Sequence, residues 1–173
     1  PQTPVMKVLG IETSCDETAA AVVEDGSRVR ASFVASQHDL HAEYGGVVPE
    51  IASRAHVDAI LPALLAALRD ASIRPADLDA VAVGHRPGLI GSLLVGVAAA
   101  KALAWALGKP LLGVDHVHAH LYAGLLHDHQ EAPPPAEFPA LGLVVSGGHT
   151  SLYALDSWTR LSRLGATLDD AMG

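Results

Sequence analysis

Short apolar runs separated by polar turns occupy the first part of the chain, a pattern typical of antiparallel strands. These runs cover residues 5–11, 19–23 and 29–36. Asp25 and Gly26, between the second and third runs, form a frequent hairpin signal. We therefore predict a three-stranded antiparallel meander, followed by a loop over residues 38–49 that contains Gly45 and Gly46.

Apolar residues recur at helical spacing from Glu50 to Leu68, which predicts a helix there. Pro62 lies inside this helix and must either kink it or begin a new one. Beyond it the pattern predicts strands over residues 78–83 and 110–114, and helices over residues 89–107 and 116–126. The order βββαβαβα predicts an α/β fold with a mixed sheet that carries helices on both faces.

A ten-residue segment near the start of the chain is similar to one in its second half. Residues 9–18 (LGIETSCDET) and 141–150 (LGLVVSGGHT) share Leu, Gly, Ser and Thr at four positions, and a second apolar run follows each. Between them, three consecutive prolines mark residues 130–139 as a linker. The chain therefore begins a second copy of its first strand–turn–strand unit.

This repeat predicts the domain organisation. We expect a first domain over residues 5–129, the linker over residues 130–139, and the start of a duplicated second domain over residues 140–173. Because the second copy is far shorter than the first, we expect the chain to be part of a two-domain protein that is cut at Gly173.

Composition excludes several classes of protein. Half of the 173 residues are hydrophobic, and 19 acidic against 11 basic residues give a formal net charge of −8. A disordered chain and a surface dominated by basic residues are thereby excluded. The single cysteine, Cys15, excludes an internal disulfide and is typical of a reducing cytosol. Residues 89–107 contain Lys101 and indicate a buried helix rather than a membrane span, and the N-terminus does not resemble a signal peptide. We expect a soluble cytoplasmic protein.

The turn formed by Ser146, Gly147 and Gly148 carries candidate binding chemistry. Glycines let backbone N–H groups approach an anion closely, and hydroxyl groups add donors. Together with the similar turn over residues 13–18, it could clamp a nucleotide phosphate or an adenylate. The alternative is a tight β-turn that only joins two strands.

A second candidate site lies at the start of the helix predicted over residues 116–126. His116 and His120 are four residues apart, so both imidazoles lie on one helical face and could share a metal ion, whereas His118 projects from another side. A metallopeptidase of the His-Glu-x-x-His type needs a glutamate where this chain has Val117. Two imidazoles also need at least one further ligand. The alternative is a histidine-rich surface turn.

With these segments the chain resembles the TsaD family of tRNA threonylcarbamoyladenosine synthesis, formerly called the Gcp or O-sialoglycoprotein endopeptidase family. The resemblance runs from Val8 to Gly173 and rests on the pair His116 and His120 and on five ordered motifs, at residues 9–18, 44–56, 87–89, 145–150 and 169–171. It implies the actin-like ATPase (ribonuclease-H-like) fold, with two duplicated domains around a cleft.

The resemblance also implies a function. Members transfer a threonylcarbamoyl group from threonylcarbamoyl-adenylate to N6 of the adenosine next to the anticodon in tRNA. It implies that His116 and His120 bind one iron or zinc ion, with a third protein ligand beyond the end of this chain. The residues implied to line the adenylate site are Val144, Val145, Ser146, Gly147 and Gly148. The implied partners are tRNA and proteins of the TsaB and TsaE types, or a second copy of the chain, in the cytoplasm and without a membrane.

Departures from the family pattern limit what this chain is expected to do alone. The family usually has glycine where Arg86 stands, and its motif after Asp169 and Asp170 continues past Gly173. We therefore expect the chain by itself to be inactive. Two alternatives are a metal-dependent glycoprotein endopeptidase, which the missing glutamate after His116 disfavours, and a non-catalytic TsaB-like scaffold, which would not need the histidine pair.

Overall fold

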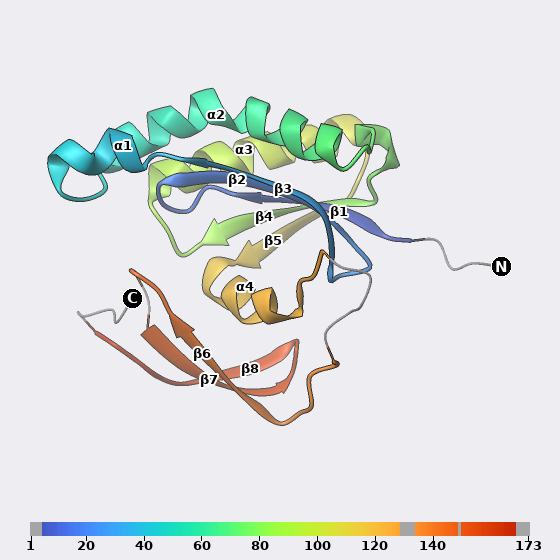
Figure 1. Ribbon diagram of the computed structural model, residues 1–173, viewed down its shortest axis with the longest axis vertical. Coiled ribbons are helices and arrows are strands. Elements are labelled where there is room, and N and C mark those ends of the chain that lie inside the picture. The colour runs from blue at the N-terminus through green and yellow to red at the C-terminus, as the bar shows by residue number, and fades with distance from the viewer. Residues whose placement is uncertain (1–4, 129–133, 149, 169–173) are drawn as a thin grey trace.

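The computed structural model describes residues 5–128, 134–148 and 150–168, and these form two β-sheets (Figure 1). The first sheet has five strands in the order β3-β2-β1-β4-β5, and the second has three in the order β6-β7-β8. The expected motif at residues 169–171 lies outside the described residues.

The first sheet begins with the predicted meander. Strands β1 (Lys7–Glu12), β2 (Glu17–Glu24) and β3 (Arg28–Ser36) pair antiparallel, and Asp25 and Gly26 both take positive φ in the turn between the last two. Strands β4 (Ala80–Arg86) and β5 (Leu111–Asp115) join β1 in parallel. The predicted mixed sheet is thereby confirmed, and the carboxyl ends of β1, β4 and β5 meet at one edge of the sheet.

The segment predicted as a loop over residues 38–49 is partly helical, so that prediction was wrong. It contains helix α1 (His38–His41) and the 3-10 turn η1 (Ala42–Tyr44). Two turns this short leave no periodicity in the sequence. Helix α2 (Pro49–Asp70) then runs through Pro62 without interruption, which excludes a new helix beginning at that proline.

The remaining helices follow the predicted order. Helix α3 (Ile90–Leu107) follows β4, after the 3-10 turn η2 (Pro75–Asp77), and helix α4 (His116–Tyr122) with turn η3 (Ala123–Leu125) follows β5. Helices α2 and α3 cover one face of the first sheet and α4 lies on the other (Figure 1). The predicted order βββαβαβα and the helices on both faces are confirmed.

The main core lies between the sheet and helices α2 and α3. Leu9, Val22 and Val81 point from the strands into this core, and Ala63 and Leu64 meet them from α2. The alternate residues of the same strands, which face the other side of the sheet, include the small residues Gly10, Ala21 and Ala82. Small side chains on that face leave space between the sheet and α4.

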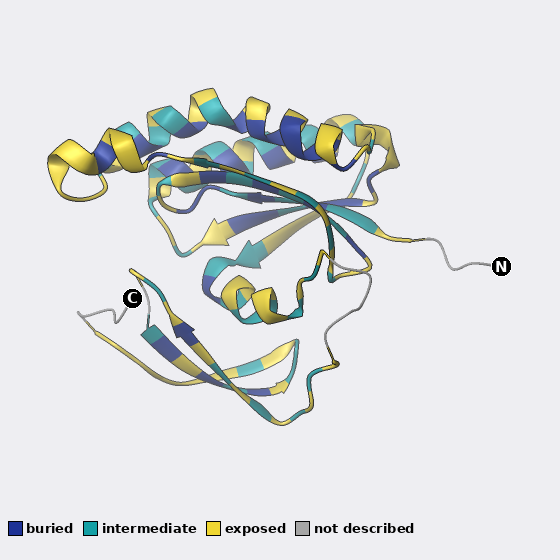
Figure 2. Cartoon of the chain, viewed as in Figure 1, coloured by how far each residue is buried: buried dark blue, intermediate teal, exposed yellow. Residues whose placement is uncertain are grey.

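Helix α3 is buried along one stripe only, contrary to the expectation of a buried helix. Ser92, Gly96, Ala100 and Ala104 recur every fourth residue and are buried, whereas Trp105 is 87% exposed. Among the described residues, α2 and α3 are long and apolar enough to span a membrane by length and composition alone. Both pack against the sheet along one side (Figure 2).

The second sheet repeats the first meander. Strands β6 (Ala140–Val145), β7 (Thr150–Ser157) and β8 (Arg160–Ala166) pair antiparallel. In the first sheet Gly10 pairs with Ala21, and in the second Gly142 pairs with Tyr153, which occupy the matching positions of the repeat. The repeat is therefore confirmed in register, and β8, which the sequence pattern did not predict, is its third strand. The domain limits stay a prediction.

Candidate functional site

Helix α4 presents His116 and His120 together on the side that faces the first sheet. The side chain of Asp115 caps the helix by accepting hydrogen bonds from the backbone N–H groups of Val117 and His118, at 3.0 and 3.2 Å. The Nε2 atoms of His116 and His120 lie 3.1 Å apart, and the rings meet edge to face. The spacing of four residues thus places both imidazoles on one face, as predicted.

The separation of the two Nε2 atoms fits a shared metal ion. Two imidazole nitrogens bound to one zinc at about 2.0–2.1 Å in a tetrahedral site would lie roughly 3.3 Å apart. Within residues 5–128, 134–148 and 150–168, no group of three or more His, Cys, Asp or Glu side chains is placed to hold a metal. In the described part of the chain, His116 and His120 are thus a pair of imidazoles whose spacing would allow both to bind one ion.

Glu12, at the end of β1, holds the first histidine. Its Oε2 lies 3.4 Å from Nδ1 of His116, and Oγ of Ser14 lies 3.2 Å from the same nitrogen. Glu12 Oε1 also accepts from the backbone N–H of Ser14 at 2.5 Å. A carboxylate on Nδ1 favours the tautomer with its proton there, which turns the Nε2 lone pair toward His120.

The same contacts shift the pKa values of Glu12 and His116. Burial opposes ionisation of Glu12, but the hydrogen bonds from His116 and Ser14 together outweigh it and lower the pKa of this carboxyl. The hydrogen bond to Glu12 raises the pKa of His116, against the opposing effect of burial. Each group therefore favours the charged form of the other.

Sequence reasoning missed Glu12, and the contact depends on a glycine between the two residues. Strand β4 lies between β1 and β5, so the carboxylate must cross it to reach His116. A Cβ on Gly84 would lie 2.3 Å from Glu12 Oε2, which no side chain could tolerate without displacing it. Gly88 likewise lets the backbone of Ser14 approach, because a Cβ added at this position would lie 2.5 Å from the Ser14 carbonyl oxygen. Gly84 lies within β4, and Gly88 lies in the segment that joins β4 to α3.

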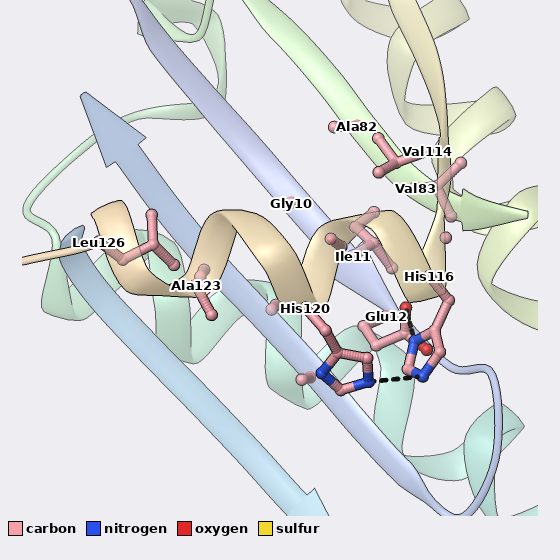
Figure 3. A pocket seen from close by; sticks show the side chains of 15 residues that line it. Gly10, Ile11, Glu12, Ala82, Val83, Val114, His116, His120, Ala123 and Leu126 are labelled. Carbon is pink, nitrogen blue, oxygen red and sulfur yellow. Dashed lines mark hydrogen bonds and ion pairs between the residues drawn. The ribbon is translucent and has the colours of Figure 1, made fainter. Parts of the chain in front are cut away.

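An apolar pocket of about 360 Å³ separates α4 from the sheet, with His116, His120 and Glu12 at one end (Figure 3). Its walls are small or apolar residues of β1, β2, β4, β5, α4 and η3, including Gly10, Ala19, Ala21, Ala82, Ala119 and Ala123. The arrangement places three polar side chains beside an apolar cavity, where electrostatic interactions are stronger than in water.

The other side of α4 packs on the second sheet. Val117 is buried in a hydrophobic cluster with Val144, Tyr153 and Leu155, and His118 meets the ring of Tyr153 at 5.6 Å. His118 thus points away from the histidine pair, as predicted. One helix therefore carries the candidate metal ligands toward the first sheet and anchors the second.

The turn after β6 lies where the repeat predicts it. Ser146 is half-buried and Gly147 and Gly148 are exposed, whereas Val144 is only 4% exposed and Val145 is 50% exposed. Because the Val144 side chain belongs to the cluster under α4, its backbone is the part left to line a ligand site. Next in the chain, His149 lies outside the described residues. The β1–β2 and β6–β7 turns lie toward the same side of the molecule (Figure 1).

Arg86 stands at the end of β4 as an exposed charge. Its Nε lies 3.4 Å from Oδ2 of Asp115, whose other oxygen caps α4. The Arg86 side chain is 69% exposed, so this ion pair contributes little to stability.

Comparisons with known proteins identify the family of this chain. The sequence model of the TsaD family, described as tRNA N6-adenosine threonylcarbamoyltransferase, matches residues 28–173. A protein of that name from Symbiobacterium thermophilum is 57% identical over 166 residues, which are 96% of this chain and 47% of the relative. Its namesake from Anaeromyxobacter dehalogenans is 58% identical over 167 residues, again 96% of this chain and 48% of the relative. The chain therefore spans about half the length of the curated relatives it matches.

Solved structures support the fold. YeaZ from Pseudomonas aeruginosa aligns with a TM-score of 0.59 and 20% sequence identity, over 94% of this chain and 66% of that one. At this identity the likeness concerns the fold alone. The predicted actin-like ATPase fold, with its ribonuclease-H-like mixed sheet, is confirmed.

Proposed function

The chain belongs to the TsaD family of tRNA N6-adenosine threonylcarbamoyltransferases, and we propose that it carries part of the site for this reaction. The reaction is the transfer of a threonylcarbamoyl group from its adenylate to N6 of the adenosine next to the anticodon in tRNA. The observation that carries the proposal is the pair His116 and His120, held at 3.1 Å beside Glu12 in a chain 57% identical to an enzyme of that name.

The chemistry defines what the protein has to stabilise. The N6 amine attacks the carbamoyl carbon, the bond from that carbon to the phosphate oxygen breaks, and AMP leaves. Because AMP is a good leaving group, hydrogen-bond donors at the phosphate contribute more than a strong base would. The Ser146–Gly148 turn offers a hydroxyl and glycine backbone N–H groups for this task, together with the backbone of Val144 and Val145.

His116 and His120 would hold one divalent metal ion, iron or zinc, through their Nε2 atoms. Bound there, the ion would supply Lewis acidity that orients the carbamoyl group. Glu12 would keep the proton on Nδ1 of His116. Many metal-bound histidines donate their other ring N–H to a carboxylate in this way. The third ligand would come from the length of protein that the relatives have and this chain does not cover.

The geometry disfavours the peptidase alternative. The residue after His116 is Val117, whose side chain is buried against the second sheet and points away from the pocket. A glutamate there could not reach a metal held by His116 and His120. The intact histidine pair and its carboxylate partner also disfavour the alternative of a non-catalytic TsaB-like scaffold, which would not need them.

The partners proposed are tRNA, threonylcarbamoyl-adenylate, and proteins of the TsaB and TsaE types, all in the cytoplasm. The outer face of the helical layer suits a protein partner or a second copy of the chain. Val57, Leu61 and Leu65 form an exposed apolar row on α2, and Leu94 and Trp105 are exposed on α3. We define these five residues as the outer helical face. In Figure 2 much of the surface of α2 that is turned away from the sheet is coloured as exposed.

Mass spectrometry of tRNA nucleosides tests the proposed function. Full-length protein is added to an extract depleted of the endogenous enzyme, and N6-threonylcarbamoyladenosine is measured. The unaltered protein and the His118→Ala control should restore the nucleoside, whereas His120→Ala should not. Failure of the unaltered protein to restore it would overturn the proposal.

A further inference from the structure

Four buried polar side chains form a cluster between the β1–β2 turn and helix α2, away from the histidine pair. Thr18 and His56 are fully buried, and Gln37 and His41 are at most 5% exposed. They come from β2, α2, the residue after β3, and α1. Buried polar groups at this density are costly unless each finds a partner. No buried side-chain N or O atom among the described residues lacks one.

The partners of His56 assign its tautomer. Nε2 lies 3.1 Å from the carbonyl oxygen of Cys15, which can only accept, so Nε2 carries the proton. Nδ1 lies 2.7 Å from Oγ1 of Thr18 and 3.3 Å from the amide nitrogen of Gln37. The amide nitrogen can only donate, so Nδ1 is an acceptor and the Thr18 hydroxyl is its other donor. His56 is therefore neutral.

The same logic continues through Gln37 to His41. Gln37 Nε2 is a donor in both of its contacts, to His56 and to the carbonyl oxygen of Ala52 at 3.4 Å, so Oε1 is its acceptor. Oε1 lies 3.2 Å from Nε2 of His41, which must donate. Nδ1 of His41 then accepts from the backbone N–H of Val48 at 3.3 Å. His41 is also neutral, with its proton on Nε2.

We infer that Gln37, His41 and His56 are positioning residues, whose continuous hydrogen-bond chain fixes the β1–β2 turn against the segment before α2. At one end of this hydrogen-bond chain His56 donates to the Cys15 carbonyl, and at the other end His41 accepts from the Val48 N–H. Each donor and acceptor has one orientation, so the hydrogen bonds have a single arrangement.

A second helix holds the same turn. Ser92 Oγ of α3 donates to the Cys15 carbonyl at 3.3 Å, and Thr13 Oγ1 donates to the Ser92 carbonyl at 2.9 Å. The turn carries Ser14, which lies beside His116 and Glu12. The network therefore acts on the candidate site only through the position of this turn.

The network also sets two walls of a separate pocket. Asp16, which follows Cys15, lines a pocket of about 440 Å³ together with His41, Gly45 and Gly46, and the two glycines come shortly before Val48. Because the two walls come from segments far apart in the sequence, a hydrogen-bond chain between them is what keeps their spacing. This gives the motif at residues 44–56 a structural task.

Nitrogen-15 NMR of the imidazoles tests the assignment on this chain. Both His41 and His56 should show a protonated Nε2 and an unprotonated Nδ1 at neutral pH. A protonated Nδ1 in either ring, or a charged imidazolium, would overturn the inferred network. This measurement does not depend on any enzymatic activity.

Variants at His56 separate positioning from mere packing. The side chain of His56→Gln retains a nitrogen donor where Nε2 lies, whereas His56→Leu fills the space without one. The carbonyl carbon-13 shift of Cys15, which reports hydrogen bonding, should stay near the unaltered value in His56→Gln and change in His56→Leu. Equal shifts in both variants would contradict the network.

Gln37→Met provides a second test if His56→Leu does not fold. Methionine has a similar length but breaks the chain at its centre, so the Val48 amide should exchange faster while the amides of β4 keep their protection. Unchanged exchange at Val48 would contradict the inference.

The consequence for catalysis rests on the proposed function. In the full-length enzyme, His56→Leu should lower kcat about tenfold or more with a smaller change in KM, because a displaced turn misplaces reacting groups. His56→Gln should recover most of the loss. If the unaltered enzyme transfers no threonylcarbamoyl group, the proposed function is wrong. The NMR results would still show whether the hydrogen-bond network exists. Full activity in His56→Leu would show that the turn needs no such positioning.

Discussion

Nδ1 of His116 lies 3.4 Å from a carboxylate oxygen of Glu12, although 103 residues separate the two in the chain. The contact crosses strand β4 and is open only because Gly84 has no side chain there. It directs Nε2 of His116 toward His120, so strands β1 and β4 and helix α4 together form one end of the pocket.

The chain should bind a divalent metal weakly, because two imidazoles are too few ligands to hold an ion tightly. Zinc or cobalt titration followed by calorimetry should show occupancy well below that of a full-length protein. His116→Ala should abolish the binding that remains, and His118→Ala, on the other side of α4, should leave it unchanged. Tight one-to-one binding by the chain would contradict a site that needs further ligands.

Glu12→Gln should weaken metal affinity in the full-length protein by about 10–100-fold, the usual cost of losing a carboxylate behind a metal-bound histidine. Gln still accepts a hydrogen bond but lacks the charge that favours the Nδ1 proton. Metal content after dialysis against graded chelator measures the change. Glu17→Gln, at the exposed start of β2, is the matched control. Equal affinity in the two variants would show that Glu12 does not support the site.

Gly84→Ala should reproduce the metal defect of Glu12→Gln, because the added Cβ would lie 2.3 Å from Glu12 Oε2 and displace the carboxylate. The matched control is Gly124→Ala, where a Cβ meets nothing within 4 Å. Both variants should be assayed for metal content and for thermal unfolding. A metal affinity of Gly84→Ala equal to that of Gly124→Ala would place the Glu12 carboxylate elsewhere.

Cys15 should react slowly with alkylating agents at neutral pH. Cys15 as a residue is exposed, but partial burial of its thiol raises the pKa of that group to about 11, and the hydrogen bond and charge of Asp16 act in the same direction. Since the thiolate is the nucleophile, the iodoacetamide rate should rise with pH and reach half its limit near pH 11. Asp16→Asn should move that midpoint to lower pH. A midpoint near 8.5, the value of a free thiol, would contradict the raised pKa of Cys15.

Association should depend on the outer helical face. Leu61→Glu and Trp105→Glu place a charge on side chains that are 60% and 87% exposed, so they should change stability by roughly 0.5 kcal/mol or less. They should weaken binding to a TsaB-type protein or self-association, measured by sedimentation. Ser32→Glu, exposed on β3, introduces the same charge and should not. Equal association in all three would place the interface elsewhere.

Local sequence patterns predicted the features of the structure that depend on the spacing of nearby residues. The histidine pair followed from residues four apart on one helix, and the β6–β7 hairpin followed from its similarity to residues 9–18. The helical turns over residues 38–44 were missed because a few residues show no period. The outer face of α3 was missed because its small buried stripe and exposed apolar residues give one uniformly apolar run.

The contact of Glu12 with His116 depends on sheet topology rather than on spacing. One signal was available in the sequence. Glu12, Gly84 and Asp115 each lie near the end of a strand, and in parallel strands those ends meet at one edge. The buried network through Gln37 and His56 had no such signal, because three separate segments supply it.

A labelled transfer reaction tests the central claim most directly. Full-length protein is incubated with unmodified tRNA and threonylcarbamoyl-adenylate labelled at the carbamoyl carbon, and the digested nucleosides are analysed by mass spectrometry. The account predicts that the label appears on N6 of the adenosine next to the anticodon, with one AMP released for each group transferred, and that His120→Ala loses this transfer. Release of AMP with no label in tRNA would contradict the claim.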